Sequence, residues 1–233
     1  NPLIAGDTLS MQSCLTALGA TFSFENGVTK VTPIKKIEKE KTLDAGNSGT
    51  TARLLLGTLA GLDVPCRIIG DASLSSRSFS EIIEPLTAAG AVIESDGGRL
   101  PVRLVSGIKK ELFVKTDSAQ VKGGVLLAGY FANVKATVEE VYPTRDVTER
   151  LLSFGGANVT RNGNVITLDG GKKEFSSFTV GGDASSAAYF MTLGLVSGET
   201  TVKNVALGVG REGFLTVARR MGGRIELKEN EDK

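Results

Sequence analysis

Apolar and polar residues follow one another along this chain in two patterns, which recur in a fixed order. Short segments with a period of two, such as residues 21–24 and 224–227, predict strands with one face in water. Other segments carry small and apolar residues on nearly every side, as at 125–131, and predict buried helices. Helices and strands therefore alternate along the chain, which indicates an α/β protein.

The pattern predicts most of the elements individually. A strong turn at Asn26-Gly27 predicts a hairpin that joins strands 21–24 and 28–34, and a charged connector follows at 35–41. Pro85 is expected near the first turn of its helix, where the missing N–H costs nothing. The predicted helices cover about 7–18, 48–61, 80–89, 125–131, 147–154, 184–195 and 212–221. Further predicted strands cover 64–69, 136–141, 201–205 and 224–227, with others after Gly90-Ala91 and around Asn162-Gly163.

The glycines that close the second helix of each segment are regularly spaced. Gly19, Gly90, Gly156 and Gly222 are separated by 71, 66 and 66 residues, and an arginine precedes the last three by 13, 11 and 11 residues. Such a period, together with a fixed order of motifs, indicates an internal repeat of β-α-β-α-β-β units. Because the first helix of each unit is apolar all round and the strands are one-sided, we expect helices inside and sheets outside, the reverse of the usual α/β barrel.

The predicted buried helices begin with small polar residues, at 47–50, 118–120 and 183–186. The unpaired N–H groups and the positive dipole end of a helix suit a phosphate or carboxylate, so converging helix ends would form an anion site. Asn47 or Ser48 is expected to cap the first of them. The cations that the repeat places nearby are Arg53, Arg77, Lys122, Arg145 and Arg211. The alternative is that these arginines pair with neighbouring acids, namely Asp71, Asp146 and Glu149.

The amino-acid composition excludes several classes of binding partner and catalytic site. The 233 residues are 41% hydrophobic with a net charge of +1, typical of a soluble globular protein without a global field for nucleic acid or an anionic membrane. The chain has no apolar run of the roughly 18 residues that a membrane span needs, so a cytoplasmic location is expected. It contains no histidine, which excludes Ser-His-Asp triads and histidine metal sites. Cys14 and Cys66 predict free, buried thiols rather than a disulfide framework or a zinc site.

Five motifs, in order along the chain, carry a resemblance to a known family. They are Gly-Asn-Ser-Gly-Thr-Thr-Ala-Arg at 46–53, Gly-Asp-Ala-Ser-Leu-Ser-Ser-Arg at 70–77, Ser-Ala-Gln-Val-Lys at 118–122, Thr-Arg-Asp-Val-Thr-Glu-Arg at 144–150 and Gly-Asp-Ala-Ser-Ser-Ala-Ala at 182–188. Over essentially its whole length the chain resembles the 5-enolpyruvylshikimate-3-phosphate synthase (3-phosphoshikimate 1-carboxyvinyltransferase) family. That resemblance implies a glyphosate-target transferase of the shikimate pathway of aromatic amino-acid biosynthesis. Its reaction moves the enolpyruvyl group of phosphoenolpyruvate to the 5-hydroxyl of shikimate 3-phosphate and releases phosphate, with no metal or organic cofactor.

The resemblance also implies an architecture. The family fold has two inside-out α/β barrel domains, each of three β-α-β-α-β-β units, with both ligands in the cleft between them. On that frame residues 1–178 form the shikimate-3-phosphate-side domain, its first unit incomplete, and 179–233 form the first unit of the second domain. The family's acid–base groups match no position here, so we expect no catalytic residue in this chain. We expect the chain alone to bind its ligands weakly, if at all, and not to turn over, with a complementary carboxy-terminal half as a possible partner.

Site roles carry over position by position. Gly49 and Arg77 match residues that hold phosphoenolpyruvate, Ser118 and Arg145 match shikimate 3-phosphate contacts, and Gln120 matches a residue between the two ligands. The expected substrate-binding set is completed by Arg53, Asn47, Thr50 and Lys122.

Three other functions are weighed against this one. The related UDP-N-acetylglucosamine enolpyruvyl transferase carries a reactive cysteine where this chain has Ala72, and Cys66 is expected to be buried on the preceding strand. A non-catalytic anion-binding or assembly module of the same repeats stays open. Nucleic-acid-end chemistry on a similar repeat fold would need a more basic surface and a catalytic histidine.

Glu212 beside Arg211 favours a structural role for that arginine.

Overall fold

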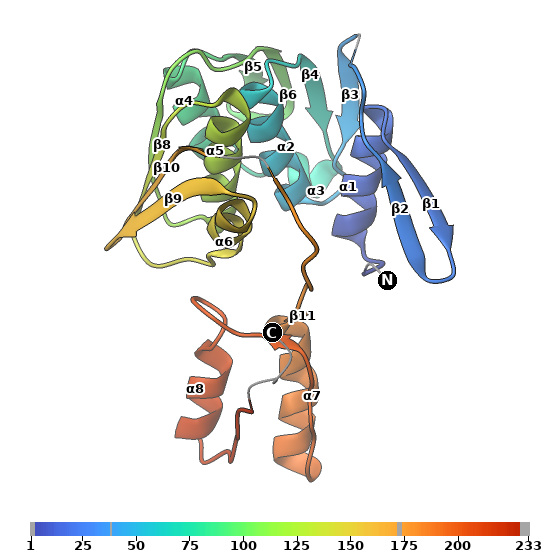
Figure 1. Cartoon of the computed structure of the whole chain (residues 1–233), viewed down its shortest axis with the longest axis vertical. Coiled ribbons are helices and arrows are strands. Elements are labelled where there is room, and N and C mark those ends of the chain that lie inside the picture. The colour runs from blue at the N-terminus through green and yellow to red at the C-terminus, as the bar shows by residue number, and fades with distance from the viewer. Residues whose placement is uncertain (1–2, 38, 172–173, 229–233) are drawn as a thin grey trace.

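The structure is a computed structural model that describes residues 3–37, 39–171 and 174–228 (Figure 1). The helices of this part are α1 Gly6–Ala17, α2 Gly49–Gly61, α3 Ala72–Ser75, α4 Ser80–Ala88, α5 Ala119–Ala132, α6 Val147–Phe154, α7 Ala184–Ser197 and α8 Gly213–Arg220. Its strands are β1 Thr21–Glu25, β2 Val28–Thr32, β3 Lys41–Asp44, β4 Cys66–Ile69, β5 Val92–Asp96, β6 Arg99–Ser106, β7 Leu112–Thr116, β8 Ala136–Glu140, β9 Ala157–Asn162, β10 Val165–Gly171, β11 Gly182–Asp183 and β12 Val205–Ala206. Residue 38 of the predicted connector and the predicted domain ends at 1 and 233 lie outside the described residues.

Two units of the chain share one topology, which confirms the internal repeat. Their four-stranded sheets have the orders β3-β4-β6-β5 and β7-β8-β10-β9. In each sheet the first two strands are parallel and the remaining pairs are antiparallel. The first helix of each unit, α2 or α5, connects the two parallel strands. The chain is therefore an α/β protein with mixed sheets, neither of which closes on itself in the described part.

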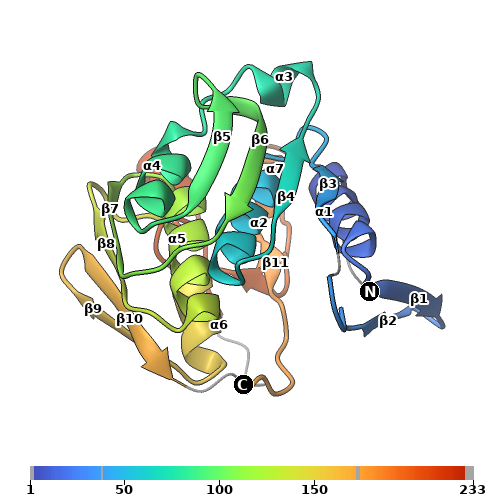
Figure 2. The ribbon, with the colours of Figure 1, turned by 90° about the horizontal axis from the view of Figure 1, so that it is seen from above.

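The first helices of these two units pack directly against each other, with the sheets outside them (Figure 2). Along α5 the residues from Val121 to Leu126 are all buried, as its apolar sequence predicts. The two helices approach closely because glycine lies at their crossing. A Cβ placed on Gly57 would lie 2.1 Å from the carbonyl oxygen of Gly124, and one on Gly61 would lie 2.4 Å from that of Ala128.

The regularly spaced glycines have a common conformation. Gly19, Gly90, Gly156 and Gly222 have φ values of 110°, 100°, 84° and 93°. Each follows the end of a helix, where a residue with positive φ reverses the chain and glycine carries no Cβ penalty. The spacing seen in the sequence therefore reflects one repeated backbone requirement.

Several expectations were wrong in detail. Residues 224–227 form no strand, and within 201–205 only Val205 belongs to one, the two-residue β12, which pairs with β11. An extended segment needs a neighbouring strand to bond its backbone, and in the described third unit β11 pairs only with β12, which leaves the rest of 201–205 and all of 224–227 without a neighbouring strand. Pro85 is the sixth residue of α4 rather than part of its first turn, and its ring is buried.

The third unit also departs from the expected helix-inside arrangement. Figure 1 shows α7 and α8 below the other units. Helix α7 is apolar, yet the exposed fractions of Tyr189, Phe190 and Val196 are 80%, 61% and 80%. In the described chain α7 is covered by little more than β11, β12 and residues near the ends of α8, which leaves these side chains in solvent. Across the described chain, every helix is too short or too polar to span a membrane.

Candidate anion site at the helix ends

Helix α2 begins at the sequence motif that the repeat singles out. The cap is Ser48, whose Oγ accepts a 3.1 Å hydrogen bond from the N–H of Thr51. Because Ser48 is buried and performs this role, the exposed side chain of Asn47 is available for another. The first-turn N–H groups at Gly49 and Thr50 have no carbonyl one turn earlier in the helix, which leaves this end suited to an anion.

Asn47 links an arginine to an acid. Its Oδ1 accepts a 2.7 Å hydrogen bond from Nη2 of Arg77, and its Nδ2 donates a 2.7 Å bond to Oδ2 of Asp71. The backbone N–H of Leu74 and the Asn47 amide hold the pKa of the Asp71 carboxyl below its usual value. Arg77 thus lies beside the start of α2, where the neutral amide of Asn47 holds it.

The start of α5 is joined to α2 through a glutamine. Nη1 of Arg53 donates to Oε1 of Gln120 at 3.2 Å, and Nε2 of Gln120 donates to Oγ1 of Thr50 at 2.9 Å. The other guanidinium nitrogen of Arg53 donates to the carbonyl of Ser78 at 2.9 Å, and its carbon lies 4.4 Å from the ring centroid of Phe79. Burial lowers the pKa of Arg53, so these acceptors and the ring compensate for its lost hydration.

Ser118 caps α5 as Ser48 caps α2. Its Oγ accepts a 3.3 Å hydrogen bond from the N–H of Val121, and its own N–H donates to Oγ1 of Thr116 at 3.0 Å. The two equivalent helices therefore begin side by side with the same chemistry, and both Ser118 and Gln120 are only half buried. This is the convergence of helix ends that the sequence predicts for the first two units.

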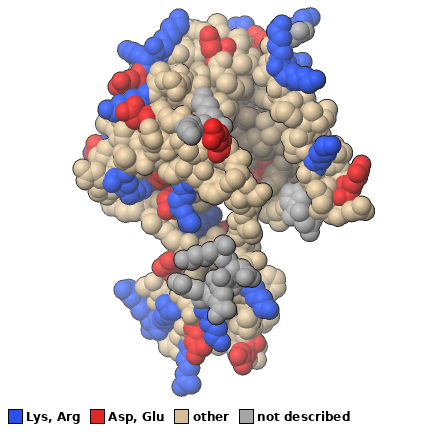
Figure 3. Space-filling model, viewed as in Figure 1, with Lys and Arg blue, Asp and Glu red and all other residues tan. Residues whose placement is uncertain are grey.

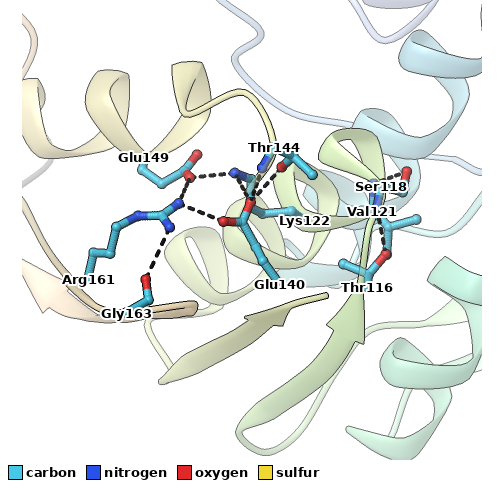
Figure 4. Close-up of polar contacts among 9 residues, drawn as sticks. All are labelled: Thr116, Ser118, Val121, Lys122, Glu140, Thr144, Glu149, Arg161 and Gly163. Atoms are coloured by element: carbon cyan, nitrogen blue, oxygen red, sulfur yellow. Dashed lines mark hydrogen bonds and ion pairs between the residues drawn. The ribbon is translucent and has the colours of Figure 1, made fainter. Parts of the chain in front are cut away.

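Lys122 has surroundings that the sequence did not predict. Its ammonium lies 2.7 Å from Oε1 of Glu140 and 2.6 Å from Oε1 of Glu149, and all three residues are buried (Figure 4). Nη2 of Arg161 lies 2.8 Å from Oε2 of Glu140 and 3.5 Å from Oε1 of Glu149. The charge of Lys122 is therefore neutralised inside the protein, and we do not include this lysine among the ligand-binding groups proposed below.

Arg145 lies in the loop between β8 and α6, with an exposed side chain. The preceding residue, Thr144, donates from both N and Oγ1 to Glu140, at 3.1 and 2.6 Å. A loop of the third unit lies against this segment, since a Cβ on Gly210 would be 3.4 Å from the Arg145 nitrogen. The structure thus joins Arg145 to the start of α5 through Thr144, Glu140 and Lys122.

Arg211 is held within the third unit. Its Nη1 donates to Oδ1 of Asp183 at 2.9 Å and to Oγ of Ser185 at 3.0 Å. Asp183 caps α7, accepting from the N–H of Ser186 at 3.0 Å. This bears out the structural pairing expected for Arg211, although the partner acid is Asp183 and not the adjacent Glu212.

The face of the molecule in Figure 3 shows no large region of one charge sign among its described residues. On the face in Figure 3, Lys and Arg are interspersed with Asp and Glu, as the net charge of +1 leads one to expect. A groove of 470 Å³ lies between α4 and β7, lined by residues that include Glu84, Phe113 and Asp117. None of the predicted site residues lines it.

The two thiols are unsuited to nucleophilic chemistry. Cys66 on β4 is buried, and burial raises its pKa to about 12. Cys14 on α1 is also buried, with a pKa raised to about 11 by burial and by Asp44. A thiol with such a pKa carries almost no thiolate at neutral pH. The expectation of free, buried cysteines is confirmed.

Comparison with known proteins bears directly on this site. The family model described as EPSP synthase (3-phosphoshikimate 1-carboxyvinyltransferase) matches residues 1–233. The chain belongs to the EPSP synthase family. Among curated relatives, the 3-phosphoshikimate 1-carboxyvinyltransferase of Thermoanaerobacter sp. (strain X514) is 39% identical over 97% of this chain and 56% of its own length. One from Thermus thermophilus is 40% identical, again over 97% of this chain and 56% of the relative.

Solved EPSP synthase structures share the fold. The EPSP synthase from Acinetobacter baumannii has a TM-score of 0.81 and 34% identity, covering 94% of this chain and 53% of that protein. The chain thus spans about half the length of the EPSP synthases that it matches.

Sequence reasoning missed Glu140 and Arg161, which enclose Lys122. A signal was present for Glu140, because it follows Ala136 and Val138 at a period of two and so shares their buried face.

Proposed function

We propose that the protein acts as a 3-phosphoshikimate 1-carboxyvinyltransferase of the shikimate pathway, in the cytoplasm. The enolpyruvyl group of phosphoenolpyruvate is transferred to the 5-hydroxyl of shikimate 3-phosphate, and phosphate is released. The observation that carries the proposal is the joining of the capped starts of α2 and α5 through Gln120, which contacts both Thr50 and Arg53. Family membership makes the two phosphorylated substrates the natural ligands of this site.

The proposed roles are those that the resemblance to the family implies, and the positions of these residues around the helix starts support them. Gly49 and Arg77, at the start of α2 and beside it, hold phosphoenolpyruvate. Ser118 and Arg145 hold shikimate 3-phosphate, and Gln120 lies between the two ligands. Helix N-termini and guanidinium groups offset the mutual repulsion of two polyanions, and holding both ligands in one site raises their effective concentration.

The proposed site is completed by three residues that hold the ligand-binding groups in place: Asn47, Thr50 and Arg53. Each already holds a partner: Asn47 the guanidinium of Arg77, and Thr50 and Arg53 the two ends of the Gln120 amide. We propose that they orient the groups that touch ligand.

At the level of the whole fold, we propose the inside-out α/β barrel arrangement, with residues 1–178 in the shikimate-3-phosphate-side domain and 179–233 in the second domain. The placement of α2 and α5 between two outward sheets supports it. No residue of this chain is proposed as the acid or base of the reaction. Turnover is proposed to need the further length that the relatives have, in the same chain or as a complementary carboxy-terminal half.

The related transfer to UDP-N-acetylglucosamine is disfavoured by two observations. Ala72 occupies the position of that enzyme's reactive cysteine, and Cys66 is buried with a raised pKa. A thiolate nucleophile is therefore not available near Arg77.

A chimera tests the proposed reaction. The matching 56% of the Thermoanaerobacter relative is replaced by this chain, and phosphate release is measured with both substrates present. We expect turnover that needs both substrates and is lost in the Arg77→Ala chimera. A chimera that is folded by circular dichroism and binds shikimate 3-phosphate, yet releases no phosphate, would support the non-catalytic anion-binding module instead.

A further inference from the structure

Glu140, at the end of β8, is the centre of a buried charged cluster. Its carboxylate accepts hydrogen bonds from Lys122, Arg161 and Thr144, the last through both N and Oγ1 (Figure 4). With Glu149, the cluster contains two cations and two carboxylates, so its formal charge is zero. Arg161 is exposed, whereas the other three residues are buried. A buried carboxylate is stable as an ion only when its hydrogen-bonding atoms are well satisfied. Glu140 meets that condition with four hydrogen bonds, whereas Oε2 of Glu149 has no hydrogen-bond partner in the described part of the chain.

Two of the three residues that donate to Glu140, Lys122 and Thr144, come from the segments that bear the proposed shikimate 3-phosphate contacts, and the third, Arg161, lies on β9. Lys122 lies in the first turn of α5, where its N–H donates to the carbonyl of Ser118 at 2.9 Å. Thr144 directly precedes Arg145 in a loop without regular secondary structure. One oxygen, Oε1 of Glu140, therefore bonds both to the helix that starts at Ser118 and to the loop that carries Arg145.

We propose that Glu140 is a positioning residue: through Thr144 it fixes the backbone of Arg145 relative to Ser118, and so sets the separation of the two groups that hold one anion. The inference rests on the proposed function for its ligand. A guanidinium on an unordered loop would lose conformational entropy on binding, whereas one on a loop already held in place binds with less loss. Glu140 can hold this loop because it is ionised and has a second lone pair to offer beyond that used by Lys122.

A purely structural role for the cluster makes a different prediction. In that case, loss of the Thr144 hydroxyl lowers stability and leaves anion affinity unchanged. Thr144→Val removes Oγ1 as a donor at nearly the same size, and Thr144→Ser restores it. Thr137→Val, on β8 but away from the cluster, is the matched control, since Thr137 is also only partly buried.

The experiment combines calorimetric titration of the 233-residue chain with shikimate 3-phosphate and amide hydrogen exchange of the peptide that covers 141–146. We expect Thr144→Val to weaken binding about tenfold or more, the effect of one hydrogen bond to a charged group, and to speed exchange in the peptide. Thr144→Ser and Thr137→Val should stay within about twofold of wild type, well below that hydrogen-bond effect.

Two results overturn the inference. The first is a Thr144→Val chain that binds as tightly as a wild-type chain with measurable affinity. The second is an equal rate of amide hydrogen exchange for the 141–146 peptide in wild type and in Thr144→Val. Absence of binding by the folded wild-type chain counts instead against the anion site proposed for this chain on its own, and the exchange rates then decide alone whether Glu140 holds the loop.

Discussion

Nη1 of Arg53 lies 3.2 Å from Oε1 of Gln120, although 67 residues separate them in the sequence. The contact joins α2 to α5 and fixes which end of the Gln120 amide faces Arg53 and which faces Thr50, both on α2, because Nε2 is then directed to Thr50. The site at the two helix ends thus has a defined donor pattern before any ligand arrives. This pre-organisation depends on Arg53. Removal of the Arg53 side chain should therefore also lower the stability of the fold.

Arg53→Met should lower the free energy of unfolding by about 2 kcal/mol, since it leaves the Ser78 carbonyl and Gln120 Oε1 without their donor and removes the contact with Phe79. Arg67→Met, at an exposed position on β4, is the control and should change stability by less than about 0.5 kcal/mol. Urea denaturation followed by circular dichroism measures both. Equal shifts of the two midpoints would argue against the described role of Arg53.

The close crossing of α2 and α5 makes a second prediction. Gly57→Ala places a methyl group 2.1 Å from the Gly124 carbonyl oxygen, so the helices must separate at a cost of about 1–3 kcal/mol. Gly213→Ala, where a Cβ meets nothing within 4 Å, should be neutral or stabilise by up to about 1 kcal/mol. Thermal denaturation of the two variants and of wild type measures these changes in stability. A Gly57→Ala chain as stable as wild type would mean that the crossing is not tightly packed.

The buried cluster and a surface ion pair offer a direct contrast between two lysines. Lys122→Met leaves the buried carboxylates of Glu140 and Glu149 without their shared cation, and should cost about 3–5 kcal/mol of stability. Lys115→Met breaks an exposed pair with Glu139 and should cost less than about 1 kcal/mol. Chemical denaturation of both chains gives the comparison. Similar small losses would contradict the burial of charge around Lys122.

Glu140 should also make stability depend on pH. Burial raises its pKa, but hydrogen bonds from Lys122, Thr144 and Arg161 outweigh that effect and lower the pKa from 4.5 to about 2. The unfolded chain therefore binds more protons between these values, so the stabilisation from Glu140 is complete above about pH 5 and is lost as the pH falls towards 2.

This dependence is tested by comparing wild type with Glu140→Gln, which does not titrate. The stability advantage of wild type should shrink steadily between about pH 6 and pH 3, as measured by urea denaturation. The exposed neighbour supplies the control: Glu139→Gln should differ from wild type by less than about 1 kcal/mol throughout. An advantage that stays constant across this range would show that the carboxylate of Glu140 is not held ionised in the folded protein.

Much of the fold could be predicted from local pattern, because it depends on local requirements. The repeat could be recognised because a glycine with positive φ follows the second helix of each unit, as at Gly90 and Gly156. The helix caps were visible for a similar reason, although sequence alone left Asn47 and Ser48 as equal candidates. Only the structure shows that Ser48 is buried as the cap while Asn47 bonds to Arg77.

What the sequence could not show was pairing over distance. Nothing local distinguishes Lys122 as a buried ion-pair partner from the cations proposed to bind ligand, because its partners lie on other elements. The prediction of a strand at 224–227 was wrong for a related reason. Alternation of apolar and polar residues shows that a segment can be extended, but a strand forms only where another segment bonds to it.

The most direct test of the anion site is calorimetric titration of the chain with shikimate 3-phosphate, repeated with Arg145→Ala. Arg211→Ala serves as the control, since Arg211 is paired with Asp183 in the third unit. We predict saturable binding by wild type and by Arg211→Ala, and loss of binding in Arg145→Ala. Unchanged binding in Arg145→Ala, or no binding by a wild-type chain whose fold is confirmed by circular dichroism, would contradict the site proposed at the starts of α2 and α5.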